Sequence, residues 1–525
     1  MVQCFVLLPP LIILGAAFFT RNIILSVILG IISAAFVAAH GLPLQTVQIT
    51  YHYFMQQLLD RENLNVYGFV IVLGGIITLI NTTGGICQFS KLITKRLQST
   101  KAVESSSLIL SCFLCIDDYL SALTTGCIMK PLTDQMRIAR VKLAFLVNTM
   151  ASPIVVLVPI SSWVALIVRQ LKSAGVSPQP GSVISAEPFY LYLQSIPFVF
   201  YSFILVGSVW FIIRRRISYG PMHTQEVAAQ QTGNLFGGME PRFLADTQPH
   251  APNHAVYLSD FFVPVLSLIT FTLIGIPLSG GYHLFGGAHN LLEAFRHTNI
   301  FTVLMASAIA SFTISCAWAL MRRVVTMRQI PSIVWNGFKL TYTSVVIIFC
   351  ALIFSTIIDK ELHTGNYLAG LLLPHVNIIF LPLIIFLIST LTALGTGSSW
   401  GTIGVVVPIT IPIVSACAQA CGIDMVTLLP ISIGAILSGA VAGAQLCPIS
   451  DPVTMASTSA GCYQIDHVKT QAWYLLPVIF CTSVSFLISE LLPLRGAANG
   501  LASSGIGLLL CIGLIASINY FAHKK

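Results

Sequence analysis

Two adjacent carboxylates, Asp117 and Asp118, lie inside an otherwise apolar run, residues 112–126, that reads CFLCIDDYLSALTTG. A charged side chain in hydrocarbon is costly and is usually kept only for a function. Hard cations bind carboxylate and hydroxyl oxygens, and Ser121 and Thr124 follow on the next turns of the expected helix. Because neighbouring side chains on a helix point about 100° apart, we expect one aspartate to face an ion or proton site. The other is expected to cap the helix or to pair with a base.

A Pro-Ile-Ser motif occurs at 159–161 and again at 448–450, each time inside a long apolar run. Proline removes a helix hydrogen bond and clashes with the carbonyl one turn back, so both runs are expected to unwind there. A kink satisfied by a neighbouring helix would explain either motif alone, but two matching breaks indicate a shared function. Freed carbonyls and half-helix ends at the membrane midplane bind ions and small anions in secondary transporters. The candidate ligands at these breaks are Ser161, Ser162, Ser450 and Asp451.

A third polar stretch, GTGSS at 395–399, interrupts another apolar run and supplies the candidate ligands Thr396, Ser398 and Ser399. Residues 397–401 also fit the G-x-S-x-G pattern of a hydrolase nucleophile. That pattern requires a strand before the serine and a helix after it, and an apolar membrane run predicts no such sheet. We therefore expect no catalytic residues here and interpret the stretch as the second half of the ion site.

The elements that must position these residues are membrane helices. Of the 525 residues, 56% are hydrophobic and only 8% are charged, with a mean hydropathy of +0.87, whereas soluble domains carry about 25% charged residues. The formal net charge of +8 comes from short basic clusters between apolar runs, which set membrane topology and do not indicate a nucleic-acid partner. The chain is therefore predicted to be an all-α polytopic membrane protein.

Apolar runs close to the roughly 20 residues that cross a bilayer recur along the whole chain. Two longer runs, about 105–130 and 376–419, have polar centres and are interpreted as re-entrant hairpins. About eleven transmembrane helices are expected besides these hairpins. They lie near 5–19, 22–39, 67–83, 141–169, 189–213, 260–280, 299–321, 335–358, 426–462, 473–490 and 504–521, of which 141–169 and 426–462 are the broken helices.

Lysine and arginine collect in short cytoplasmic loops of membrane proteins. Basic residues flank 105–130 on both sides and recur at 214–216, at 322–328 and at the end of the chain, which predicts a cytoplasmic carboxyl terminus in a bacterial inner membrane. Three spans, a hairpin, a broken span and one more span then occur twice with opposite orientation, an arrangement typical of transporters. The predicted organisation is a first inverted repeat at 1–213, a cytoplasmic linker at 214–259, a second inverted repeat at 260–490 and an extra transmembrane helix within 491–525.

The 13 cysteines and 12 histidines lack the spacing of a zinc site. The cysteines are expected to be small buried hydrophobes, and the histidines to be solvated loop residues. His467, beside Asp466, is a candidate pH sensor in a cytoplasmic loop. No cofactor is expected, and Na⁺ and H⁺ are the expected coupling ions.

The polar motifs form an ordered series: IDDY at 116–119, KPLTD at 130–134, KLA at 142–144, VPISSW at 158–163, GTGSSWGT at 395–402, SGA at 438–440, PISD at 448–451, and GC followed by IDHVKTQ within 461–471. This series resembles the NhaC-type sodium/proton antiporters of the ion transporter superfamily, over about residues 67–490. The resemblance implies a dimeric, elevator-like transporter with a scaffold domain and a moving domain. The moving domain would hold both hairpins and both broken helices.

The chain departs from this family pattern at two places. Asn148-Thr149 stands where the family usually has Asp-Ser-Thr, and Gly443-Ala444-Gln445 stands where it usually has Gly-Asp-His. Asn148 and Gln445 can still line a site, but neither side chain titrates. The missing acids and histidine point to a lower proton count, a shifted stoichiometry, or a relative that carries an organic solute.

The leading hypothesis is exchange of Na⁺ for H⁺ by alternating access, with Asp117, Asp118 and Asp451 as the candidate Na⁺ site. A bound cation favours the ionised carboxylate, and a proton displaces the cation. The alternative is a Na⁺- or H⁺-coupled symporter or exchanger of a small organic acid or amino acid, held by the positive half-helix ends near Ser161 and Ser399. A membrane-embedded enzyme is disfavoured because no nucleophile is paired with a base. The expected partners are the lipid bilayer, a small cation, a small organic solute in the alternative, and a second copy in a homodimer.

Overall fold

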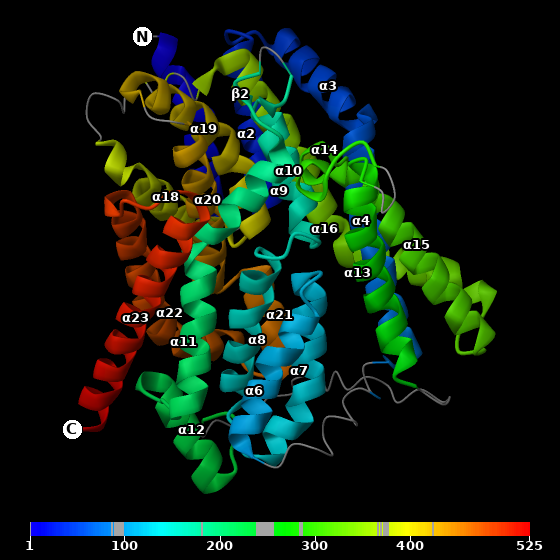
Figure 1. The fold of residues 1–525 in the computed structure, drawn as a ribbon, viewed down its shortest axis with the longest axis vertical. Helices are drawn as coiled ribbons and strands as arrows, with labels where there is room; N and C mark the ends of the chain where they lie inside the picture. The colour runs from blue at the N-terminus through cyan, green and yellow to red at the C-terminus, as the bar shows by residue number, and fades with distance from the viewer. Residues whose placement is uncertain are drawn as a thin grey trace.

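Helices make up almost the whole of the described chain (Figure 1), which confirms the predicted all-α class. The structure is a computed structural model. One parallel pair of two-residue strands, β1 (Val176–Ser177) and β2 (Ile184–Ser185), is the only sheet among the described residues. The residues that the structure describes are 2–20, 22–85, 88, 99–179, 182–237, 257–282, 287–364, 367, 370, 377–422 and 425–524.

The amino-terminal part of the chain holds the first Pro-Ile-Ser motif, between helices α8 and α9. It comprises the helices and strands of residues 2–232. In chain order they are η1 (Val2–Leu7), α1 (Leu8–Thr20), α2 (Ile23–Ala38), α3 (Pro43–Leu59), α4 (Arg61–Thr83), α6 (Thr100–Phe113), α7 (Asp118–Gln135), α8 (Arg140–Val155), α9 (Ser162–Ser173), β1, β2, α10 (Pro188–Ser195), η2 (Ile196–Phe198), α11 (Phe200–Arg215) and α12 (Gly220–Thr232).

The carboxyl-terminal part holds the second motif, between helices α20 and α21. A π-helical turn, η4, ends the longest helix before it. In chain order the elements are α13 (Ser259–Ser279), α14 (Leu291–His297), α15 (Ile300–Met321), η3 (Met327–Gln329), α16 (Ile330–Ile357), η4 (Ile358–Leu362), η5 (Ile378–Phe380), α18 (Leu381–Thr396), α19 (Ser399–Cys421), α20 (Met425–Leu446), α21 (Asp451–Ala460), α22 (Gln464–Leu491) and α23 (Gly496–His523).

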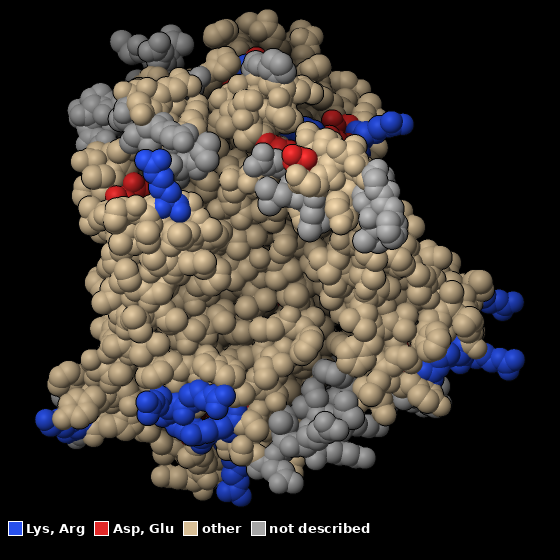
Figure 2. Space-filling model, in the orientation of Figure 1, with Lys and Arg blue, Asp and Glu red and all other residues tan. Residues whose placement is uncertain are grey.

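A broad area without charge covers the middle of the face of the molecule shown in Figure 2, with charged side chains above and below it and basic side chains also at its right edge. Nine of the described helices are long and apolar enough to cross a bilayer, and the bent pair formed by Pro188–Phe198 and Phe200–Thr232 is a further candidate. An apolar band of this kind is what a hydrocarbon core requires of the surface that it contacts. The chain is therefore a multi-pass membrane protein.

Several predicted spans differ from the helices that form. The run 22–39 is α2, which is shorter than a full span, and the run 189–213 bends by 43°. The bend has a physical cause in Pro197 of η2, which cannot continue the helix hydrogen-bond ladder. Three helices fall outside the predicted spans: α3, the short α14, and α12 within the predicted linker, where Pro221 occupies a first-turn position that costs no hydrogen bond. The rest of that linker, 238–256, lies outside the described residues.

Both long runs with a Pro-Ile-Ser motif are divided. Helix α8 ends at Val155 and α9 begins at Ser162, and α20 ends at Leu446 and α21 begins at Asp451. Short turns at the polar motifs IDDY and GTGSS join α6 to α7 and α18 to α19. The division into inverted repeats and the re-entrant insertion of these pairs in the membrane stay predictions.

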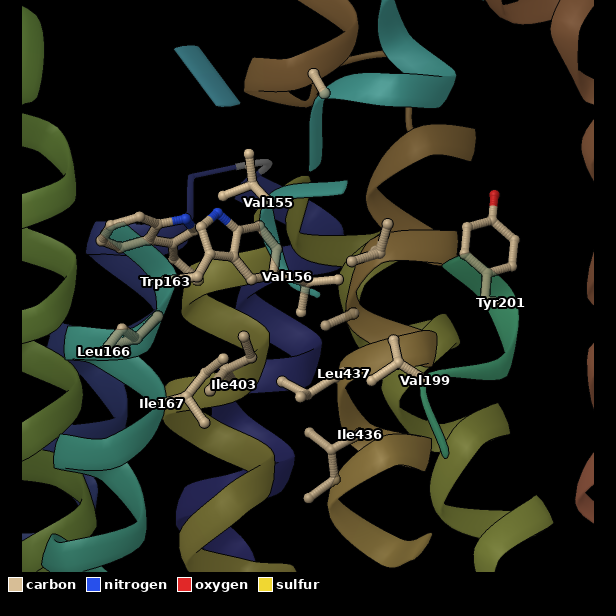
Figure 3. Packing of buried hydrophobic residues seen from close by; sticks show 14 of the residues in the cluster. Val155, Val156, Trp163, Leu166, Ile167, Val199, Tyr201, Ile403, Ile436 and Leu437 are labelled. Carbon is tan, nitrogen blue, oxygen red and sulfur yellow. The ribbon is translucent and has the colours of Figure 1, made fainter. Parts of the chain in front are cut away.

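An apolar layer lies beside the helix breaks (Figure 3). Trp163 of α9, Ile403 of α19, Leu437 of α20 and Val199 beside α11 are all fully buried in it. The indole of Trp163 also meets Trp400 of α19 edge to face, with ring centroids 6.3 Å apart. Dispersion contacts of this density hold the two broken helices and α19 together where the hydrophobic effect between membrane helices is weak.

An ionic network fastens α9 to the start of α4, on the side of the bundle where β1 and β2 lie. Arg169 donates to Asp60 at 3.1 Å and to Glu62 at 3.0 Å, and Lys172 donates to Glu62 at 2.5 Å. Beside this network a cavity of about 270 Å³ is lined by Glu62, Lys172 and Glu187, and also by residues of α14, α15 and the loop between them. Glu187 accepts the backbone N–H of Tyr190 at 2.8 Å and so caps α10.

Glu187 predicts a pH dependence of stability. Burial raises the pKa of this carboxyl to about 7, whereas an unfolded chain leaves it at about 4.5. Between these values the folded protein holds a proton that the unfolded chain has released, so its contribution is full below about pH 4.5 and is lost as the pH rises through 7. Glu187→Gln, which keeps a capping oxygen, should flatten the fall in melting temperature between pH 5 and 7. An unchanged slope in a thermal unfolding series would show that Glu187 carries none of it.

Candidate ion-binding site

Two polar turns, 114–117 between α6 and α7 and 397–398 between α18 and α19, each lie against one of the two helix breaks, 156–161 and 447–450. The backbone N–H of Ser162, at the start of α9, donates to the carbonyl of Ile116 at 2.9 Å, which ties the first turn to the first break. Gly397 in the second turn has φ +70, and a Cβ added there would lie 3.2 Å from Ile449 of the second break. The backbone is thus closely packed at both junctions, and the tight second turn requires glycine.

The two aspartates of the first turn have separate roles. Asp117 is the N-cap of α7, where Oδ1 accepts the backbone N–H of Leu120 at 3.0 Å and Oδ2 accepts the hydroxyl of Ser162 at 2.9 Å. Asp118 accepts the hydroxyl of Ser152 on α8 at 3.0 Å through Oδ2, and its buried Oδ1 has no hydrogen-bond partner. Asp118 is therefore the carboxylate with an oxygen left for a ligand.

Asp118 and Asp451 line the same cavity, of about 10 Å³, at the meeting point of α7, α16, α19 and α21. The phenol of Tyr119 donates to Asp451 Oδ2 at 3.2 Å and so links α7 to α21. Asp117 does not line this cavity, so the three predicted carboxylates do not converge on one point. The other residues that line it are Tyr119, Ser344, Ile347, Gly397, Ser398, Ser399, Trp400 and Pro452.

Four helices, α7, α9, α19 and α21, begin around this cavity or beside it. A helix N-terminus carries a partial positive charge and free N–H groups, which stabilise negative charge nearby. Ser161 and Ser450 stand at the N-cap positions of α9 and α21 without a capping hydrogen bond, and their buried hydroxyls, like that of Ser399, have no partner. The arrangement can hold ionised carboxylates, and with them a small cation, in a buried place.

The remaining hydroxyl candidates hold local structure. Ser398 caps α19 by accepting the backbone N–H of Gly401 at 3.0 Å, and Thr396 donates to the carbonyl of Ser398 at 3.4 Å. Ser121 donates to the carbonyl of Ser111 on α6 at 3.5 Å. Thr124 is buried in α7 and does not line the cavity.

Asn148 and Gln445 lie in a separate, buried amide cluster and not at the cavity. Asn148 donates to Gln471 Oε1 at 2.9 Å, Gln445 donates to the carbonyl of Asn148 at 2.6 Å, and Tyr201 donates to Gln445 Oε1 at 2.7 Å. Gln471 in turn donates to the carbonyl of Gln445 at 2.6 Å. Each residue comes from a different helix, so the cluster joins α8, α11, α20 and α22 through neutral groups.

Sequence reasoning left three neighbours of the aspartates unassigned. The position of Tyr119 could have been expected, because this residue directly follows the aspartate pair. Ser152 stands one residue before Pro153 inside α8, and Ser344 lies in α16 outside every polar motif. Their approach to the site depends on helix packing, which the chain order does not reveal.

The expectation that His467 is solvated in a loop is wrong. His467 lies in α22, is fully buried, and has its Nδ1 2.8 Å from the hydroxyl of Ser457 on α21. Its ring links the second broken helix to α22. Because it is buried, it is not exposed to the pH of an aqueous loop. Across the part of the chain that the structure describes, no three His, Cys, Asp or Glu side chains form a metal-binding cluster.

Comparisons with known proteins agree with these features. An uncharacterised protein of Haemophilus influenzae is 27% identical over 531 residues, which cover 99% of this chain and 95% of that protein. The malate-2H⁺/Na⁺-lactate antiporter of Bacillus subtilis is 32% identical over 132 residues, or 24% of this chain and 26% of that protein. The crystal structure of the YdaH transporter of Alcanivorax borkumensis is similar with a TM-score of 0.52 and 12% identity, over 85% of this chain and 89% of that one, and shows the fold alone.

The model of the Na⁺/H⁺ antiporter family matches residues 154–491. This match includes the second polar turn, the Pro-Ile-Ser-Asp break and helix α22, and it confirms the resemblance drawn from the sequence motifs. The chain belongs to the Na⁺/H⁺ antiporter family and is a secondary transporter of the membrane.

Proposed function

We propose that this transporter exchanges Na⁺ for H⁺ by alternating access, with Asp118 and Asp451 as the charged ligands of the cation. The observation that carries the proposal is the cavity of about 10 Å³ between them. Asp118 and Ser399 both line it, and each has a buried oxygen without a hydrogen-bond partner. A space of this size suits one small ion or water and is too small for an organic solute.

Exchange follows from competition for the same oxygens. Na⁺ binds the ionised carboxylates, and a proton on Asp118 removes the negative charge that holds the cation, so the two ligands exclude each other. Asp117 would keep the turn in place by capping α7, and Tyr119 would orient Asp451 through their hydrogen bond. The breaks beside the cavity supply the hinge that opens it to one side and then to the other.

A second candidate is a Na⁺- or H⁺-coupled carrier of a small organic acid or amino acid. The helix N-termini of α7, α19 and α21 at the cavity favour a carboxylate, and the partial similarity to a malate/lactate antiporter points the same way. In this case the cavity would have to widen to admit the solute. The absence of titratable groups at Asn148 and Gln445 fits this candidate as well, because it lowers the number of protons carried.

Orientation and assembly complete the proposal. The carboxyl terminus and α12 lie at the same end of the molecule (Figure 1), and Arg214 and Arg215 end α11 there. The positive-inside rule assigns this end to the cytoplasm of a bacterial inner membrane. The family resemblance supports a homodimer that works as an elevator.

The test is proton flux in proteoliposomes with an imposed pH gradient, read by a pH-sensitive dye. Na⁺, Li⁺ and K⁺ are added in turn, followed by small organic acids and amino acids, with protein-free liposomes as the control. Collapse of the gradient by Na⁺ or Li⁺ alone supports the antiporter. A gradient that responds only when an organic solute is present assigns the chain to the second candidate.

A further inference from the structure

A second group of buried charges lies away from the ion cavity, where α6, α8 and α12 meet. Glu104 of α6 is 1% exposed and Lys142 of α8 is 4% exposed. Lys142 Nζ lies 3.5 Å from Glu104 Oε1 and 2.5 Å from Glu226 Oε1 of α12. The other carboxylate oxygen of Glu104, Oε2, is buried without any hydrogen-bond partner.

The charges of the three side chains in contact do not balance, and Arg216, which also acts on Glu104, forms no ion pair with it. Two carboxylates share one ammonium, and an uncompensated charge in a low-dielectric interior is strongly disfavoured. The negative charge of Glu226 is stabilised further, because this side chain is less buried and accepts the hydroxyl of Ser218. Among the residues that the structure describes, Lys142 is the only cation within ion-pair distance of Glu104, so a proton on Glu104 is the change that removes the excess negative charge of this group.

Buried hydroxyls lead from Glu104 toward the aspartates. Ser107 and Ser111 follow Glu104 by three and seven residues and so share its face of α6, over a rise of about 10 Å. Ser111 donates to the hydroxyl of Thr125 on α7 at 3.2 Å, and its carbonyl accepts the hydroxyl of Ser121. Ser121 lies one turn after Asp118 on the same helix. All four hydroxyl residues are at most 1% exposed.

We propose that Glu104 is a second proton-binding residue of this transporter, loaded from the side of α12 and connected to Asp118 through the buried hydroxyls of α6 and α7. The inference rests on the proposed function only in requiring that protons move. Each step transfers one proton: the Glu104 carboxylic acid becomes a carboxylate, and each hydroxyl that accepts the proton gives its own proton to the next group. For this transfer the hydroxyls of Ser107 and Ser121 must turn away from the backbone carbonyls of Val103 and Ser111, to which they donate. In this chain Glu104 supplies a titratable group that Asn148 and Gln445 cannot provide.

The groups that face Glu104 set when it holds the proton. Lys142 stabilises the carboxylate, and the charges of Glu226 from α12 and Arg216 after α11 act on it with opposite signs. The phenol of Tyr474 on α22 lies near Lys142. Since Glu226 competes for Lys142, helix α12 controls how strongly Glu104 holds its proton.

The first test is Glu104→Gln in the full-length protein, reconstituted and assayed with whichever solute moves protons in the wild type. We expect proton flux to fall at least about tenfold and its pH dependence to flatten, with Na⁺ protection against thermal unfolding retained. The matched control is Asp134→Asn, at the same end of the molecule, where the carboxylate is paired with Arg140 at 2.9 Å and partly exposed. The control should keep the wild-type pH profile. A wild-type rate and profile in Glu104→Gln would overturn the inference.

A second variant keeps the test decisive if Glu104→Gln does not fold. Glu226→Gln leaves Lys142 to Glu104 alone, so Glu104 should stay ionised to lower pH and the flux profile should move to lower pH. A profile that does not move contradicts the proposal.

Infrared difference spectroscopy separates this inference from the proposed function, because it requires no transport. The wild type should show a carboxylic acid C=O band that titrates with pH and is lost in Glu104→Gln. If the band is present but no cation drives protons, the proposed function fails alone. If protons move but the band survives in Glu104→Gln, the inference fails alone.

Discussion

Replacing Asp118 by Asn should lower Na⁺-driven proton flux at least about a hundredfold, because it removes a proposed charged ligand that lines the cavity and has an oxygen without a hydrogen-bond partner. Asparagine has nearly the same shape and its amide oxygen can still accept the hydroxyl of Ser152, so the fold should be kept. The measurement is the dye assay in proteoliposomes, together with thermal unfolding in detergent to verify that the variant is folded.

Asp117→Asn is the matched comparison, since the two aspartates are neighbours in the chain. Asparagine is as good an N-cap as aspartate, and its side-chain oxygen can still accept the N–H of Leu120 that Asp117 accepts. Flux should therefore fall less than about tenfold. Equal and complete losses in both variants would place both carboxylates at the ion and contradict the separate roles that the hydrogen bonds assign to them.

The local chemistry of the site was predictable from the sequence. Charged residues in an apolar run, and prolines inside long helices, have few explanations in a membrane protein. The 100° step between Asp117 and Asp118 predicts that one faces a site and that the other caps the helix or pairs with a base. Asp117 is the cap, and ion binding by Asp118 stays a prediction.

Contacts between distant helices were not predictable in the same way. Asn148 stands where the resemblance implies an acid and Gln445 where it implies a histidine, yet Gln445 bonds to the carbonyl of Asn148 and to Tyr201 in a cluster away from the cavity. His467 follows an aspartate in a polar stretch, yet packing buries it against Ser457. A single sequence shows which side chains are polar but not which of them face one another, because that depends on how the helices cross.

The packing of α20 against α18 carries the second large prediction. Gly439 and Gly443 lie four residues apart on α20, on the face that meets α18. A Cβ at Gly443 would lie 2.1 Å from the backbone carbonyl oxygen of Thr390, and one at Gly439 would lie 2.5 Å from that of Phe386. Small residues at this spacing let two membrane helices approach closely, and a backbone atom cannot turn aside as a side chain can.

Gly443→Ala should therefore push the two helices apart. Overpacking of this kind costs roughly 3 kcal/mol, while alanine returns about 1 kcal/mol in helix propensity, so the net loss of stability is about 2 kcal/mol. Gly513→Ala is the control, because Gly513 of α23 has no atom within 4 Å of an added Cβ. Thermal unfolding in detergent should show a lower melting temperature for Gly443→Ala and no loss for Gly513→Ala. Transport by Gly443→Ala should fall together with its melting temperature, since α20 leads directly into the break that places Asp451 at the cavity. Equal melting temperatures would mean that α18 and α20 can separate without cost, and that their close approach does not fix the position of Asp451.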